Sequence, residues 1–173
     1  MRVLGIDVGL RGGLSLADTQ RVILAEELPE MPLHTEDLVE IIKNWDVTHV
    51  YLEKAQSMPR QGVSSVFTYA TGYGAIIGVV KTLKLPLRLV QPREWTREMH
   101  KGTTYVEPPK VDGKKSKTNP AKERSKEAAL NLFPHMNFLV SPRSKKLHDG
   151  LIDSSLIAEF GRREQLGKFN AAS

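Results

Sequence analysis

The sequence contains no cysteine. Disulfide bonds and thiolate metal sites are therefore excluded, and any bound metal must be held by oxygen or imidazole ligands. Such ligands favour hard divalent cations such as Mg²⁺ or Mn²⁺. The absence of cysteine is also ordinary for an intracellular protein.

Long uninterrupted apolar runs are missing as well. Every stretch of about 18 apolar residues contains a charge or a turn-forming residue, so the pattern predicts no membrane-spanning helix. Residues 1–10 lead directly into an apolar strand and show no signal-peptide pattern. We therefore expect a soluble, cytoplasmic protein without a membrane partner.

The length and charge of the chain narrow its organisation. A chain of 173 residues with 40% hydrophobic content can bury one good core and is short for two domains. We predict one domain over residues 1–165 and a tail at 166–173. The net charge of +5 is compatible with a polyanionic partner, although many basic proteins bind no nucleic acid.

The first part of the chain has the pattern of a β-meander followed by a helix. Residues 3–9, 14–17 and 22–24 are short apolar runs separated by turn-forming residues, which predicts three antiparallel strands. Residues 35–44 have helical spacing, and we predict Thr35 as the N-cap of this helix.

Strand and helix patterns then alternate along the rest of the chain. Strands are predicted at 49–53 and 87–90, and helices at 62–83, from Pro92, at about 120–133 and at about 148–163. This order fits an α/β fold with a mixed sheet. The 62–83 helix is apolar on two sides, so one side can cover the sheet and the other can form a subunit interface.

Two carboxylates occupy strand positions where burial of a lone charge is costly. Asp7 lies inside an apolar strand between Gly5 and Gly9, and Glu53 ends the 49–53 strand. Each also has a purely structural explanation. Asp7 could end its strand and cap the following turn, and Glu53 could be the first solvated residue after its strand.

A second pair of carboxylates is harder to explain structurally. Asp149 and Asp153 are four residues apart on the last helix, and Leu156 and Phe160 continue the same face, so the pair should face the protein body. A favourable position at the helix N-terminus explains Asp149 but not both. Two like charges turned inward are costly unless a cation neutralises them. Together with Asp7 and Glu53, the pair could hold two ions about 4 Å apart, as in phosphodiester hydrolysis by two metals.

Three motifs in this order resemble the RuvC-type Holliday junction resolvases, especially their small phage versions. They are residues 5–9 (GIDVG), 52–54 (LEK) followed by the glycine-containing helix, and 148–158 (HDGLIDSSLIA). The resemblance implies an RNase H-like fold with a mixed five-stranded sheet flanked by helices. It also implies a homodimer in a bacterial or phage-infected cell, which cuts four-way DNA junctions with two Mg²⁺ ions per site, or Mn²⁺ in their place.

Position by position, the resemblance assigns the metal-binding acids to Asp7, Glu53, Asp149 and Asp153. Lys122 matches a basic residue that assists at the scissile phosphate in the family, and a solvated helix face is the alternative explanation for it. The acidic pair is spaced by four residues here, whereas the cellular enzymes usually use three. Asp149 or the neighbouring His148 could therefore fill that role.

This sequence lacks one feature of the resolvase family, an aromatic wedge, and it contains a basic loop. The family carries an aromatic wedge shortly after the second acid, and residues 55–60 contain no aromatic side chain. Met58 could supply apolar bulk there, although ordinary packing is the alternative. Residues 101–119 form a predicted flexible basic loop, and residues 101–126 hold eight basic and three acidic residues. Such a segment contacts phosphates without reading bases, unless it is only a solubilising insertion. The predicted DNA contacts are Met58, Arg60, Lys110, Lys114, Lys115, Lys117, Lys122 and Lys126.

The leading prediction is a structure-selective endodeoxyribonuclease that resolves branched DNA. One alternative is an RNA-processing or less selective nuclease, because the fold and the acids do not choose the substrate. Another is a non-catalytic junction-binding protein that keeps the fold and the basic loop.

Overall fold

A five-stranded mixed sheet forms the centre of the molecule. The computed structural model describes residues 1–9, 11–55, 62–106 and 119–168. The strands lie in the order β3-β2-β1-β4-β5. The first three pair antiparallel, whereas β4 and β5 run parallel to β1. Their bounds are β1 (Val3–Asp7), β2 (Gly13–Ala17), β3 (Val22–Glu27), β4 (His49–Glu53) and β5 (Leu87–Val90).

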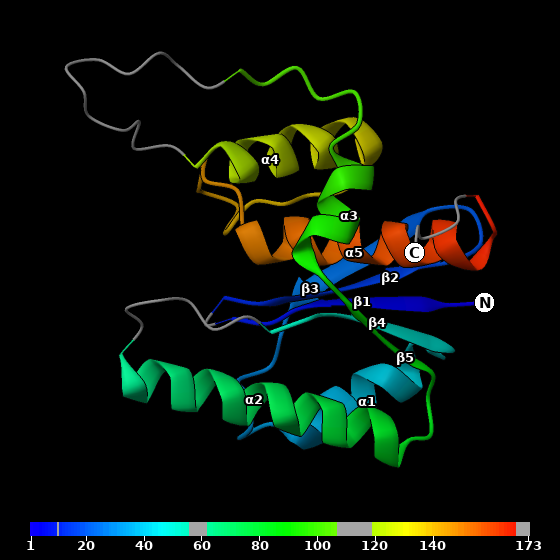
Figure 1. Cartoon of the computed structure of the whole chain (residues 1–173), viewed down its shortest axis with the longest axis vertical. Helices are drawn as coiled ribbons and strands as arrows, with labels where there is room; N and C mark the ends of the chain where they lie inside the picture. The colour runs from blue at the N-terminus through cyan, green and yellow to red at the C-terminus, as the bar shows by residue number, and fades with distance from the viewer. Residues whose placement is uncertain (10, 56–61, 107–118, 169–173) are drawn as a thin grey trace.

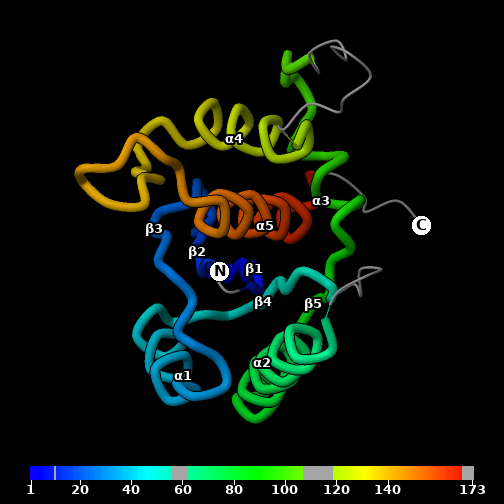
Figure 2. The backbone as a smooth tube through the Cα atoms, turned by 90° about the vertical axis from the view of Figure 1, so that its left-hand side faces the viewer, coloured from blue at the N-terminus to red at the C-terminus, as the bar shows by residue number. Residues whose placement is uncertain are grey.

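Helices cover both faces of this sheet. They are α1 (Thr35–Asn44), α2 (Val63–Thr82), α3 (Pro92–Met99), α4 (Pro120–Leu132) and α5 (Asp149–Gln165). Helices α1 and α2 lie on one face and α5 lies directly on the other, with α3 and α4 outside α5 (Figures 1 and 2). Each face has its own buried apolar cluster. The predicted α/β fold with a mixed five-stranded sheet is confirmed.

Glycines let α5 approach the sheet more closely than any side chain would allow. A Cβ on Gly5 of β1 would lie 2.4 Å from the backbone nitrogen of Ala158, and one on Gly13 of β2 would lie 2.3 Å from the carbonyl oxygen of Gly150. Real Cβ atoms do not come this close to backbone atoms. The hydroxyl of Ser15 adds hydrogen bonds of 2.7 and 2.9 Å to two serines of α5. The acidic residues of α5 are therefore brought close to the end of β1.

The predicted cap of α1 is wrong. His34 is the N-cap residue and makes no side-chain capping hydrogen bond, while Thr35 is already the first helical residue. The acidic residues Glu36 and Asp37 lie in the first turn, where they favour the helix electrostatically. Charge thus replaces a side-chain cap at this terminus.

Helix α2 packs on the sheet along one side only. Ile76 and Val80 are fully buried, whereas Val63 and Phe67 in its first half are 87% and 72% exposed. By length and composition alone α2 could cross a membrane, which the sequence pattern did not predict, although one such helix is weak evidence. The sheet-facing side follows the prediction, and the proposed subunit interface on the other side stays a prediction.

Candidate active site

Two of the predicted acids lie at the ends of neighbouring strands. Ile6 pairs with Leu52 in the parallel β1–β4 ladder, and Asp7 and Glu53 follow directly after them. The carboxyl ends of parallel strands meet at one edge of the sheet, so the two side chains lie side by side. They share a hydrogen bond, which requires one proton between them.

Asp153 of α5 faces these two acids from the covering layer. Burial raises the pKa of Asp7 well above its usual value, and the negative charges of Asp153 and Glu53 raise it further. Burial, followed by the charge of Glu53, raises the pKa of Asp153 to about 7. Three carboxylates from β1, β4 and α5 therefore repel one another in a largely desolvated place. Such a group is relieved by protons or by cations.

Asp149 lies at the more open side of the site, beside Lys122 of α4. The Lys122 ammonium donates a 2.6 Å hydrogen bond to Oδ2 of Asp149, whose side chain is 36% exposed. Although burial acts in the opposite direction, this lysine lowers the pKa of Asp149. The contact raises the pKa of Lys122, and the charges of Asp153 and Asp7 add to the effect. The structure thus brings all four predicted acids and Lys122 into one electrostatic group.

The donor set of this group suits a hard divalent cation. All four acids offer carboxylate oxygens, which are the ligands preferred by Mg²⁺ and Mn²⁺. Among the residues that the structure describes, no three acidic or histidine side chains are arranged to hold an ion as they stand. Asp7 is hydrogen-bonded to Glu53, and Asp149 is paired with Lys122. Metal binding would need these two contacts to open.

His148 is the N-cap of α5, and the metal-binding role considered for it from the sequence stays a prediction. Its side chain is 1% exposed, and its Nδ1 accepts a 3.2 Å hydrogen bond from the backbone N–H of Leu151 as the N-cap of α5. Its Nε2 faces Glu27 of β3 at 3.3 Å. Nε2 is buried and has no hydrogen-bond partner among the described residues, whereas the Nδ1 contact fixes the start of α5.

Sequence patterns did not reveal two side-chain contacts with the acids. The indole N–H of Trp95 in α3 donates a 2.9 Å hydrogen bond to Oε1 of Glu53. The hydroxyl of Ser125 in α4 hydrogen-bonds Asp153 and also lies 3.1 Å from Nε2 of His100. Trp95 lies in a polar segment, and its N–H needs a partner once the ring is buried, but the sequence does not say which partner it takes.

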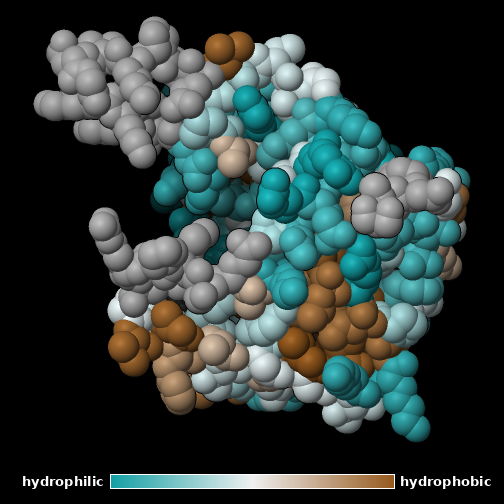
Figure 3. All heavy atoms as spheres, in the orientation of Figure 1, coloured by the Kyte–Doolittle hydropathy of each residue, from teal (hydrophilic) through white to brown (hydrophobic). Residues whose placement is uncertain are grey.

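A basic pocket of about 720 Å³ lies on α3 and the start of α4. Hydrophilic side chains gather over these two helices (Figure 3). Arg93, Arg97 and Arg124 line the pocket, and no carboxylate in the described part of the chain forms an ion pair with them. Its full lining is Gln91, Arg93, Glu94, Thr96, Arg97, His100, Lys101 and Arg124. The pocket can accept an anion such as a phosphate.

The predicted DNA contacts are only partly visible. Lys126 forms a 2.9 Å ion pair with Glu123 on its own helix. Lys122 points to the acids rather than away from them. The other predicted contacts lie outside the described residues, and they are Met58, Arg60, Lys110, Lys114, Lys115 and Lys117.

Comparisons with known proteins identify the fold. No protein-family model matches the sequence, and no curated protein matches it. Among solved structures, Thermus thermophilus RuvC in complex with a Holliday junction substrate matches with a TM-score of 0.62 and 16% identity, over 96% of both chains. This chain has the RuvC-type resolvase fold.

Two further resolvases extend the same likeness beyond bacteria. The fowlpox virus resolvase, solved with Holliday junction DNA, matches with a TM-score of 0.56 and 14% identity, over 96% of this chain and 99% of that one. The yeast mitochondrial Holliday junction resolvase Ydc2 matches with a TM-score of 0.51 and 16% identity, over 95% of this chain and 78% of that one. The resolvase fold thus spans nearly the whole chain, as the sequence motifs predicted.

Proposed function

We propose that this protein is a metal-dependent endonuclease that resolves four-way DNA junctions. The observation that carries the proposal is the meeting of Asp7, Glu53 and Asp153 beside Lys122, at the carboxyl edge of β1 and β4. This arrangement occurs in a fold shared with resolvases that were solved on junction DNA. Fold likeness alone does not specify a reaction, and the buried acids supply the chemical argument.

The four acids and Lys122 have different roles in the proposed reaction. Asp7, Glu53, Asp149 and Asp153 would hold two Mg²⁺ ions, which activate water and stabilise the leaving oxygen in phosphodiester hydrolysis. With Asp149 as a metal ligand, the Lys122 ammonium would be free of its 2.6 Å contact and could pair with a phosphate oxygen. Lys122 thus neutralises phosphate charge next to the acids.

Two further features support the proposal that the substrate is a branched, two-fold symmetric DNA. They are the basic pocket and the exposed surface of α2. The arginines of the α3–α4 pocket can hold a backbone phosphate outside the site. The exposed Val63 and Phe67 of α2 offer an apolar surface to a second copy of the chain. Apolar side chains also gather over β5 and the adjoining part of α2 (Figure 3). A homodimer would present two sites to one junction.

Cleavage of a synthetic four-way junction tests the proposal directly. The purified protein should nick the junction in Mg²⁺ and not in EDTA. Asp7→Asn should abolish cutting and keep junction binding, because it removes a ligand without adding bulk. Asp37→Asn is a matched control, since Asp37 lies on α1 with its side chain 57% exposed. A fully active Asp7→Asn protein would rule the proposal out.

Substrate range separates the proposal from its alternatives. Rates on a junction, a replication fork, an RNA/DNA hybrid and structured RNA should be compared at the same Mg²⁺ concentration. Faster cutting of RNA substrates would favour an RNA-processing nuclease. Calorimetry that detects no Mg²⁺ binding, together with intact junction binding, would favour a non-catalytic protein.

A further inference from the structure

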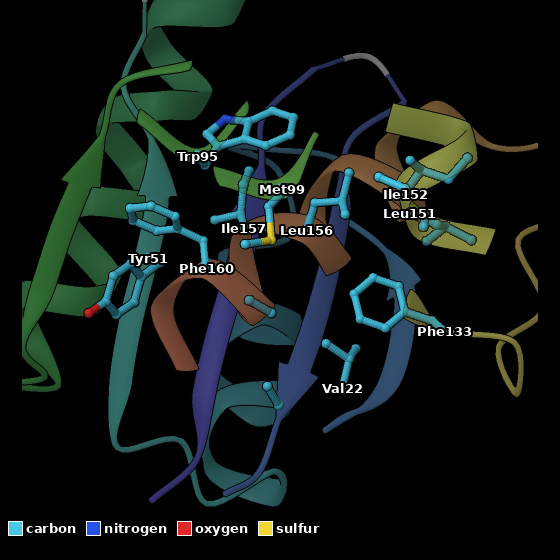
Figure 4. Close-up of a cluster of buried hydrophobic side chains, with 14 of the residues drawn as sticks. Val22, Tyr51, Trp95, Met99, Phe133, Leu151, Ile152, Leu156, Ile157 and Phe160 are labelled. Carbon is cyan, nitrogen blue, oxygen red and sulfur yellow. The ribbon is translucent and has the colours of Figure 1, made fainter. Parts of the chain in front are cut away.

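Trp95 joins the apolar core to the acidic group. Its side chain is 3% exposed and lies in the cluster that also holds Met99 and Ile157 (Figure 4). Packing in this cluster fixes the plane of the indole, and the ring N–H donates to Oε1 of Glu53 at 2.9 Å. The position of that carboxylate oxygen is thereby tied to a rigid core residue.

This hydrogen bond differs from the others that Glu53 makes. The bond between Asp7 and Glu53 needs a proton on one of the two acids, and this proton would be lost if both carboxylates bound a metal. The indole N–H is a donor in every state of the protein because it has no acceptor form. It can therefore hold one oxygen of Glu53 while the other oxygen coordinates an ion.

The far end of α3 reaches Asp153 through a serine. His100 follows the last residue of α3, and its Nε2 lies 3.1 Å from the hydroxyl of Ser125, which is 5% exposed. That hydroxyl hydrogen-bonds Asp153. The rings of Trp95 and His100 meet edge to face with their centroids 6.0 Å apart. One short helix thus contacts two of the acids, one directly and one through a hydroxyl.

We propose that α3 is the element that orients the metal-binding carboxylates, with Trp95 as the positioning residue for Glu53 and His100, through Ser125, for Asp153. The inference rests on the proposed function and adds residues to it that lie outside the acidic group itself. Partners that orient a metal ligand typically change metal affinity by about 10-fold to 100-fold when they are removed.

A merely structural role for Trp95 makes a different prediction. A buried tryptophan needs a hydrogen-bond partner in any case, so loss of the N–H would then lower stability and leave metal binding unchanged. The decisive measurement therefore follows the metal rather than the fold.

Tryptophan fluorescence gives that measurement without any cleavage assay. The chain has two tryptophans, and Trp45 lies at the end of α1 on the other face of the sheet. In a Trp45→Phe protein, Trp95 is the sole reporter, and Mg²⁺ should change its emission with saturation because its N–H bonds a metal ligand. In a Trp95→Phe protein, Mg²⁺ should leave the emission of Trp45 unchanged. Unchanged Trp95 emission while calorimetry shows Mg²⁺ bound would overturn the proposal.

The affinity for metal is then compared between matched variants. Trp95→Phe keeps an aromatic ring and removes the donor, and its dissociation constant for Mg²⁺ by calorimetry should rise by about 10-fold or more. Met99→Leu is the control, because Met99 is buried one turn along α3 in the same cluster and its side chain carries no N–H or O–H donor for an acid. It should bind Mg²⁺ as the wild type does. Equal affinity in both variants, at equal loss of melting temperature, would make Trp95 a core residue only.

The role of His100 is tested by comparing one substitution that removes its hydrogen bond with one that can restore it. His100→Leu should weaken Mg²⁺ binding, whereas His100→Gln should restore most of it because the amide can again bond the Ser125 hydroxyl. Equal behaviour of the two variants would remove His100 from the proposal. These outcomes are separate from the proposed function, which fails instead if the wild type binds Mg²⁺ but cuts no junction.

Discussion

The two faces of the sheet are built in different ways. On the α5 face, the helix lies so close that Gly5, Gly13 and Gly150 have no room for a Cβ. On the α2 face, Gly74 and Gly78 have no neighbouring atom within 4 Å of such a Cβ, and the first half of the helix is exposed. Close approach is thus required where acids from a strand and a helix must meet. The open face is free to serve association.

The largest expected effect on stability comes from a substitution that disrupts the contact between α5 and the sheet. A Cβ on Gly150 would lie 2.1 Å from the carbonyl oxygen of Arg11, and that backbone has no flexible end to yield. Gly150→Ala should therefore lower the free energy of unfolding by about 3 kcal/mol or more, measured by urea denaturation. A variant as stable as the wild type would show that α5 lies farther from the sheet than described.

The second-largest expected effect on stability comes from the buried carboxyl group of Asp153. The pKa of Asp153 is raised to about 7 in the folded protein, from an ordinary value of 3.8. The folded state thus binds this proton more tightly, and the stability that the proton contributes is full below pH ~4 and is lost as the pH rises through about 7.

Asp153→Asn should accordingly stabilise the metal-free protein at pH 8 by about 1 to 3 kcal/mol and change it little at pH 4. Thermal unfolding in EDTA at the two pH values measures this difference. Mg²⁺ should raise the melting temperature of the wild type at pH 8 more than that of the variant. A variant less stable than the wild type at pH 8 would contradict the described crowding of the acids.

A smaller effect of opposite sign is expected on the open face. Gly74→Ala adds a methyl group where no atom lies within 4 Å and improves helix propensity. It should raise the free energy of unfolding by about 0.5 to 1 kcal/mol. The measurement is best made in a Phe67→Glu protein, so that association does not contribute.

The smallest effect on stability belongs to the proposed interface. Phe67 is 72% exposed, so Phe67→Glu should change the stability of the single chain by no more than about 0.5 kcal/mol. Sedimentation should nevertheless show the variant at the 19.3 kDa chain mass and the wild type at twice that mass. A wild type that stays monomeric at micromolar concentration would remove both the interface and symmetric paired nicking.

Local patterns were sufficient for most of the secondary structure. Strand and helix periodicity depend on neighbours a few residues apart, so β1, β4 and α2 were predicted close to their observed bounds. Strand β3 extends to Glu27, beyond the apolar run at 22–24, because backbone pairing with β2 continues where the side chains turn polar. Thr35 was misplaced because sequence shows a capping residue type but not the dihedral angles that decide its position.

For the acids too, the sequence shows their local positions, whereas their meeting in space depends on the fold. The spacing of Asp149 and Asp153 and the strand positions of Asp7 and Glu53 were visible in the sequence, since each is a local property. Their meeting depends on parallel pairing of β1 with β4 and on a glycine-lined contact with α5.

Only tertiary structure decided the partners of those acids. Trp95 is 42 residues from Glu53, and His100 is 25 residues from Ser125. Side-chain hydrogen bonds over such separations follow from the packing of α3 and α4 beside α5, and no sequence period encodes that packing. Sequence was therefore enough to name the carboxylates, and the fold was needed to show what holds them in place.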